Sequence, residues 1–229
     1  IPGVLERQMA YRGWLRSIGR RDLSPENSPH RRLGYRSYLL NNRFPFPIYI
    51  IGLDTSWLAG DDHDDGKLYL TEDQVMMLCT DNGKQLPGFR IALAHHPLTA
   101  LADGTSCRRH LADTVDVLLR GHLHEVEPEI WQDPTRRLCQ LATGCLYDPH
   151  GSDRTINGHQ VITCFLSSSG HCQRMQIRVR GWSPRGFWCD NNSLYANSKN
   201  GIMTIPHTSL PESDERSSSS SIKAKNLLG

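Results

Sequence analysis

Two short apolar runs, each ending in a cluster of histidines, constrain the fold more than any other feature of the sequence. Residues 89–94 (FRIALA) lead into His95-His96-Pro97, and residues 115–120 (VDVLLR) lead into Gly121-His122-Leu123-His124. Such runs are typical of buried strands in an α/β sheet, and chemistry in these sheets collects where strands end. We therefore predict an α/β fold with histidine clusters at strand ends.

A helix is predicted between the two runs. Pro87-Gly88 breaks the chain before the first run, and Thr105 or Ser106 begins a helix that runs toward Thr114. The order strand, histidine loop, helix, strand, histidine loop is a βαβ-like unit. If its two strands are parallel, both histidine loops lie at the same edge of the sheet.

The histidine clusters indicate a metal site. His122 and His124 project to the same side of an extended chain, and Gly121 allows the sharp turn that would aim both imidazoles at one point. Neutral imidazole is the commonest transition-metal ligand. Adjacent histidines rarely point the same way, so we interpret His96 as a structural or supporting residue. The alternative is that these histidines are ordinary hydrogen-bonded loop residues.

The two motifs, in this order, resemble those of the calcineurin-like metallophosphoesterases, and the match covers roughly residues 35 to 165. The resemblance implies a β-sandwich core flanked by helices, with a dinuclear site of Mn, Fe or Zn at one edge. It also implies hydrolysis of a phosphate ester by metal-bound hydroxide. Carried over by position, His95 and His122 would bind one ion and His124 the other.

The family also places Asp-x-His, Gly-Asp-x-x-Asp and Gly-Asn-His-Asp or -Glu, in that order, before these motifs. We interpret the segment before His95 as lacking all three motifs. Their loss removes a bridging aspartate and an asparagine ligand, and a histidine-only set favours Zn over Mn or Mg. Because the chain begins with Ile1-Pro2-Gly3, we expect the C-terminal portion of a longer enzyme, with hydrolysis requiring the missing motifs.

Two other functions stay open at this point. The chain could be a non-catalytic interaction module that keeps the phosphoesterase fold and docks a protein partner through its aromatic C-terminal segment. It could also hold a mononuclear Zn site, because three histidines can bind Zn with water in the fourth position. Under the enzyme hypothesis the partner is a phosphate ester of unspecified identity.

Composition fits one globular domain, at 38% hydrophobic and 22% charged residues. We assign residues 1–208 to it and expect a disordered Ser-rich tail at 209–229. A net charge of +2, with scattered arginine pairs, predicts no nucleic-acid patch, and no segment is apolar enough to span a membrane. The seven cysteines form no Cys-x-x-Cys pair, which favours reduced thiols in a cytoplasmic protein.

Further predictions concern the surroundings of the clusters. Strands at 35–40 and 48–53 should pair, and Asp54 should be a structural or supporting residue at the end of the second. The acidic run 61–65 should be a solvated loop. Thr71 and Gln74 should form a capping box, in which each side chain bonds a backbone amide near the other. We also predict a helix at 4–20, strands at 137–142, 159–166 and 174–180 as a mostly antiparallel extension, and core packing for the aromatic segment 181–188.

Overall fold

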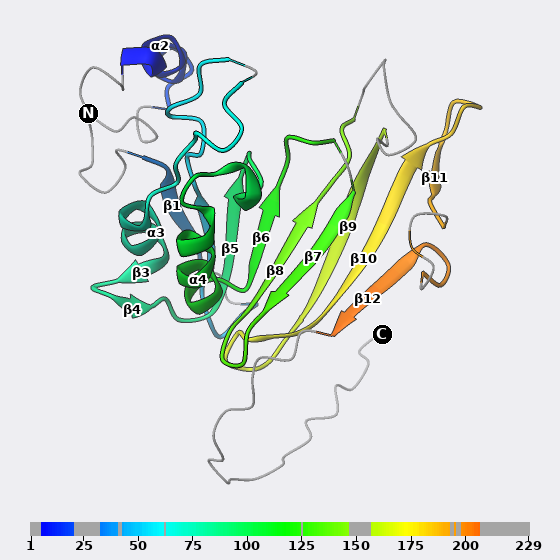
Figure 1. The fold of residues 1–229 in the computed structure, drawn as a ribbon. Coiled ribbons are helices and arrows are strands. Elements are labelled where there is room, and N and C mark those ends of the chain that lie inside the picture. Colours follow the sequence, from blue (N-terminus) through cyan, green and yellow to red (C-terminus); the bar gives the residue numbers. More distant parts are fainter. Residues whose placement is uncertain are drawn as a thin grey trace, which may run out of the picture.

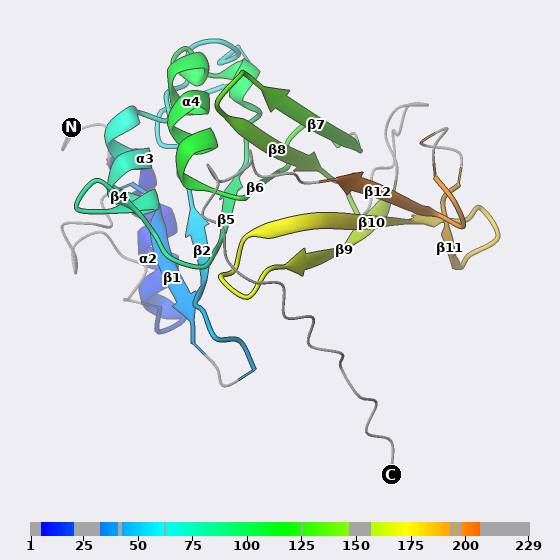
Figure 2. The ribbon, with the colours of Figure 1, turned by 90° about the horizontal axis from the view of Figure 1, so that it is seen from below.

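The computed structural model describes residues 6–20, 33–40, 43–61, 63–124, 126–146, 157–192, 195 and 198–206. They form three layers: helices, a six-stranded sheet and a four-stranded sheet (Figures 1 and 2). The fold is therefore α/β, with two sheets packed face to face and helices on the outer face of the first. The predicted tail at 209–229 lies outside the described residues.

The first sheet has the order β1-β2-β5-β6-β8-β7. The central strands are parallel, whereas β1 and β7 are antiparallel to their neighbours. Its strands are β1 (Tyr35–Leu39), β2 (Ile48–Gly52), β5 (Phe89–Ala94), β6 (Val117–Arg120), β7 (Glu127–Gln132) and β8 (Arg137–Ala142). The predicted pairing of 35–40 with 48–53 is confirmed. The strand at 137–142 is parallel to β6 and belongs to this sheet, so its prediction as part of an antiparallel extension is wrong.

The second sheet has the order β11-β10-β12, with β9 on the other side of β10, and all its pairings are antiparallel. Its strands are β9 (Gly158–Leu166), β10 (Cys172–Trp182), β11 (Trp188–Asp190) and β12 (Ile202–Pro206). This confirms the antiparallel prediction for β9 and β10. Sequence reasoning missed β7, β11 and β12, which are short or polar.

Helices α3 (Glu72–Cys79) and α4 (Gly104–Thr114) cover the first sheet (Figure 2). The short elements η1 (Glu6–Gln8), α2 (Met9–Ser17), β3 (Thr80–Asp81), β4 (Lys84–Gln85) and η5 (Leu98–Ala100) complete the described fold. The predicted N-terminal helix is shorter than 4–20, ending at Ser17. No described helix is long and apolar enough to cross a membrane.

Two hydrophobic clusters hold the layers together. One lies between the helices and the first sheet and includes Leu111 of α4 and Leu118 of β6. The other lies between the sheets and includes Leu141 of β8 with Met175 and Ile177 of β10. All seven cysteines are free thiols, and four of them are buried. Residues that alternate along β6 thus face the helices and the second sheet in turn, as expected for a strand buried on both faces.

The aromatic segment at 181–188 does not pack in the core, so that prediction is wrong. Trp182 is 49% exposed and Phe187 is 52% exposed. The antiparallel register places Trp182 opposite Trp188 at the end of β10. Both tryptophans therefore lie at one end of the second sheet, beyond the apolar layer between the sheets.

Candidate metal centre

Parallel pairing of β5 and β6 brings the two histidine loops together. Ala94 is the register partner of Arg120, so the residues that follow each of them start at the same sheet edge. The Gly121 amide donates a hydrogen bond of 3.2 Å to the His95 carbonyl, which continues the ladder one step beyond the strands. The prediction of one shared edge is confirmed, and α4 is the helix of the predicted βαβ unit.

Three imidazoles converge beyond this edge. The candidate ligand atoms of His95, His96 and His122 all lie within 4.8 Å of one another. His122 Nδ1 and His95 Nε2 are 3.2 Å apart. Among the described residues, no other group of three or more His, Cys, Asp or Glu side chains comes together in this way. We refer to these three residues as the histidine cluster.

The backbone around the second motif is held in an unusual conformation. His122 has a φ of 78° and His124 has a φ of 55°, both in the left-handed region that non-glycine residues rarely adopt. The sharp turn therefore falls on the two histidines and not on Gly121, where we predicted it. Strained backbone of this kind persists only where the surrounding structure fixes it, and it gathers at functional sites.

Thr55 fixes the orientation of His96. The His96 amide donates to Thr55 Oγ1 at 3.2 Å, and Thr55 Oγ1 lies 2.9 Å from His96 Nδ1. Thr55 is 1% exposed and His96 is 7% exposed, so water does not compete for these bonds. If Nδ1 carries the proton and donates to Thr55, the Nε2 lone pair is free to bind a metal. This contact joins the loop after β2 to the loop after β5.

Electrostatics in the cluster favour neutral imidazoles. Desolvation, followed by the neighbouring charges of His122 and His124, lowers the pKa of His95. Desolvation is also the main cause that lowers the pKa of His96, followed by the charges of His122 and His95. A lower pKa keeps the ring nitrogens deprotonated and available to a cation near neutral pH.

His124 lies outside the histidine cluster but close enough for its charge to lower the pKa of His95. The sequence-based assignment gave His124 to the second ion, and His95 and His122 to the first. The structure brings together the two predicted ligands of the first ion and adds His96. Sequence reasoning gave His96 only a supporting role, because the contact that orients its ring comes from Thr55, 41 residues earlier.

Two acidic positions lie around the cluster. Asp54 follows β2, and its carboxylate accepts hydrogen bonds from Gln8 Nε2 at 2.7 Å and from the Ser56 amide at 3.0 Å. The charge of Asp64 raises the pKa of His96, opposing the desolvation, so the acidic loop approaches the cluster. Asp61 and Asp65 in that loop are exposed. The loop also contains Gly-Asp-x-x-Asp at residues 60–64 and Asp-x-His at residues 61–63, so the interpretation that all three motifs are missing before His95 is wrong for these two spacings.

The donor set fits one divalent cation. Zn–N bonds of about 2.0 to 2.1 Å in tetrahedral geometry place ligand nitrogens about 3.4 Å apart. The 3.2 Å separation between His95 Nε2 and His122 Nδ1 is close to that spacing. Three imidazoles without a carboxylate suit Zn better than Mg or Mn. Chemically, the histidine cluster can therefore hold one ion and leave a coordination position for a further ligand.

No protein-family model matches the chain, and no curated protein matches its sequence. A sulfate thiohydrolase, SoxB of Thermus thermophilus in complex with glycerol, has a TM-score of 0.39 and 14% identity over 62% of this chain. GAP50, the anchor in the inner membrane complex of Plasmodium, has a TM-score of 0.38 and 13% identity over 79% of this chain. A putative 5'-nucleotidase of Staphylococcus aureus in complex with alpha-ketoglutarate has a TM-score of 0.28 and 11% identity over 75%.

The chain covers 24%, 56% and 29% of the lengths of these three proteins, respectively. Similarity at this level assigns no family and no activity. The geometry of the histidine cluster carries the functional interpretation instead.

Proposed function

We propose that this chain contributes a divalent-metal site to a metal-dependent phosphate-ester hydrolase. His95, His96 and His122 would hold this ion, and His124 lies outside their group, although the resemblance assigns it to a second ion. The observation that carries the proposal is the convergence of three imidazoles within 4.8 Å at the edge where two parallel strands end. The resemblance of both histidine motifs to those of calcineurin-like phosphoesterases supplies the reaction class.

Each residue has a defined part in this proposal. His95 and His122 supply two ligand nitrogens 3.2 Å apart, and the bond from Thr55 to His96 Nδ1 leaves Nε2 as the ring nitrogen available to the ion. A divalent ion bound there supplies Lewis-acid polarisation of a phosphate ester. The neutral imidazoles leave the positive charge of the ion uncompensated, which favours an anionic substrate.

We expect this chain to hydrolyse phosphate esters slowly. The described residues around the cluster contribute imidazoles, and the nearby Asp54 carboxylate is engaged with Gln8 and Ser56. A hydrolytic site with two ions requires bridging oxygen ligands that stabilise both the attacking and the leaving oxygen. We therefore expect measurable hydrolysis of an activated ester, at a rate well below that of a two-ion enzyme.

The test is hydrolysis of bis(p-nitrophenyl) phosphate and p-nitrophenyl phosphate by the full chain with Zn or Mn, followed as p-nitrophenolate release. We expect turnover that requires the metal, stops with a chelator and is lost in His122→Ala. The matched control is His171→Ala, in the β9–β10 connection, which should keep the wild-type rate. Equal rates in His122→Ala would refute the assigned site. Zn binding without turnover would refute the hydrolase and favour a mononuclear or non-catalytic module.

A further inference from the structure

The outer face of the second sheet carries a row of arginines that the proposed function does not use. Strand β10 alternates, so Met175, Ile177 and Val179 are buried between the sheets while Arg174 and Arg178 are exposed on the other face. Arg180 follows the same alternation. Among the described residues, no helix covers this face (Figure 2). The arginines therefore form a stripe along the middle of an accessible sheet.

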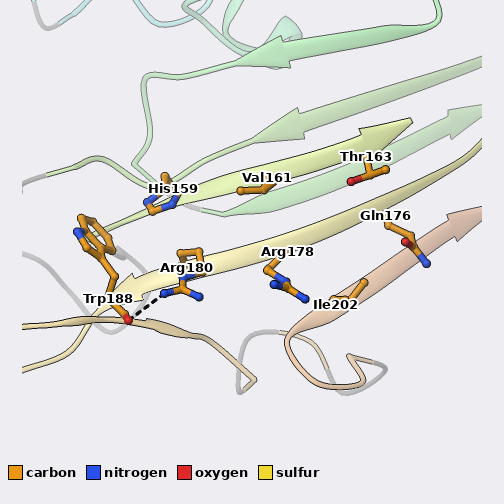
Figure 3. A pocket seen from close by; sticks show the side chains of 8 residues that line it. All are labelled: His159, Val161, Thr163, Gln176, Arg178, Arg180, Trp188 and Ile202. Carbon is orange, nitrogen blue, oxygen red and sulfur yellow. Dashed lines mark hydrogen bonds between the residues drawn. The ribbon is translucent and has the colours of Figure 1, made fainter. Parts of the chain in front are cut away.

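A groove runs over this stripe. Its volume is about 570 Å³, and its lining side chains come from β9, β10, β11 and β12 (Figure 3). Arg178 has Val161 of β9 on one side and Ile202 of β12 on the other as register partners. The side chains of both neighbours are shorter than that of arginine, so they flank the Arg178 side chain without covering its guanidinium. None of the lining residues belongs to the histidine cluster.

Aromatic rings lie at both ends of the stripe. At one end, the Trp182 and Trp188 ring centroids are 5.2 Å apart at 72°, and His159 packs edge-on against Trp188 at 4.8 Å. At the other end, the Arg174 guanidinium lies 3.8 Å from the Phe165 ring centroid. From Arg174 to Trp182 the strand advances about 27 Å, at about 3.4 Å per residue. Aromatic rings thus lie at the two ends of β10, and the positive charges of the arginine stripe lie along the strand between them.

The charge of this region is one-sided. Residues 157–206 contain five Arg or Lys and a single acidic residue, Asp190. That carboxylate accepts a hydrogen bond of 3.0 Å from Arg180 Nη1, and Arg180 Nη2 donates to the Trp188 carbonyl at 2.9 Å. Arg180 is therefore held in place beside the tryptophans. Arg178 is exposed and makes no hydrogen bond or ion pair with the described residues, so it is available to an anion.

We propose that the outer face of the second sheet binds single-stranded nucleic acid. Proteins that bind single strands combine a basic groove that follows the phosphates with exposed rings on which bases stack. A duplex keeps its bases stacked inside and cannot use the tryptophans, and an acidic peptide offers no planar rings to them. Polar side chains in the groove, Gln176 and Thr163, can bond to base edges.

This surface could not be predicted from net charge, because acidic residues elsewhere bring the whole chain to +2. The alternation of Arg, Gln and Arg with apolar residues in β10 was the available signal. Once β10 is known to be buried on only one side, this alternation predicts that its arginines and Gln176 lie together on the exposed face of the sheet.

The test is fluorescence anisotropy of labelled oligothymidylate and oligouridylate with the full chain in EDTA, which removes any contribution from a metal at the histidine cluster. We expect Trp182→Ala to weaken binding by about five- to a hundredfold. We expect Arg178→Gln to weaken binding and to reduce the slope of log affinity against log salt by about 0.7. His122→Ala should bind as the wild type does, which keeps this surface separate from the proposed function.

The matched controls are Trp14→Ala on α2, a residue that is 53% exposed and therefore similar to Trp182, and Arg109→Gln on α4. Both should leave binding unchanged, and thermal melting checks that all five variants are folded. Equal weakening by the controls, or equal affinity for a duplex of the same length, would overturn the proposal. Absence of binding would also overturn the proposal. Equal affinity for a free mononucleotide and for the oligomer would overturn it as well, and would assign the groove to a small ligand.

Discussion

At the scale of single residues, the histidine cluster depends on contacts that hold each ring in place. His122 and His124 adopt left-handed backbone, and His96 is oriented by a buried hydroxyl. Such features cost free energy in the folded chain, by about 1 to 3 kcal/mol for each strained residue. Because these features lower the stability of the folded chain, their presence at one sheet edge indicates a ligand site.

Replacing Thr55 by Val tests the role of the hydroxyl. Val has nearly the same shape, but the His96 amide and Nδ1 lose their shared partner. We expect Zn affinity to fall by about 10- to 100-fold and the free energy of unfolding to fall by about 1 to 3 kcal/mol. Competition with a zinc indicator measures the first and urea unfolding the second. Thr99→Val, at an exposed position nearby, should change neither. Unchanged Zn affinity in Thr55→Val would show that His96 is not a ligand.

Substitutions at His122 test the backbone strain. Glycine adopts a φ of 78° without the steric cost that alanine has there. We expect His122→Gly to be more stable than His122→Ala by about 1 kcal/mol or more in metal-free urea unfolding. At His95, whose φ is not positive, the order should be reversed. If alanine is as stable as glycine at position 122, the loop is not strained in solution.

At the scale of elements, the βαβ unit is fixed at the end opposite the histidines. Arg90 at the start of β5 and Asp116 just before β6 form a two-pronged ion pair, with Nε–Oδ2 at 2.8 Å and Nη2–Oδ1 at 2.9 Å. Their side chains are 4% and 6% exposed. The pair fixes the relative register of the two strands, and the histidine loops are placed by that register.

The ion pair gives a prediction about stability. Asp116→Asn leaves the Arg90 guanidinium buried without its counter-charge, so we expect a loss of about 3 to 5 kcal/mol in the free energy of unfolding. Asp113→Asn breaks the ion pair with Arg136. The Asp113 side chain is 45% exposed and the Arg136 side chain is 37% exposed. There we expect a much smaller loss, because solvent screens an exposed ion pair. Similar losses in the two variants would mean that the buried pair does not fix the strands.

At the scale of the whole molecule, three layers place two different surfaces on one chain. The histidine cluster lies at the edge of the first sheet, and the arginine stripe lies on the outer face of the second. The first sheet is covered by α3 and α4, whereas the described helices leave the second uncovered (Figure 2). The same alternation that buries one face of β10 exposes the other to ligands.

The sequence predicted the parts of this arrangement that depend on local signals. The α/β class, the strands at β5 and β6, α4 and the shared edge follow from apolar runs and turn residues. The Thr71 cap of α3 was also correct, since Thr71 accepts from the Gln74 amide at 3.3 Å. The Gln74 side chain, however, bonds Asp54 and Leu70 and does not reach back to Thr71, because a tertiary partner was available.

Features that depend on distant partners could not be predicted. Strand β8 pairs with β6 in parallel because of the sheet as a whole, and nothing in residues 137–142 specifies that neighbour. Strand β7 contains Pro128 between two glutamates, which looks like a loop but is tolerated at a sheet edge. The cluster role of His96 depends on Thr55, and the exposure of Trp182 depends on where the second sheet ends.

Whether the histidine cluster binds a metal can be measured as the zinc content of the purified full chain, by elemental analysis after exposure to Zn and extensive dialysis. We expect about one tightly held ion per chain in the wild type and in His171→Ala, and loss of most of it in His95→Ala and His122→Ala. A wild-type chain without zinc, or His95→Ala and His122→Ala chains that retain it in full, would contradict the claim that these imidazoles form a metal centre.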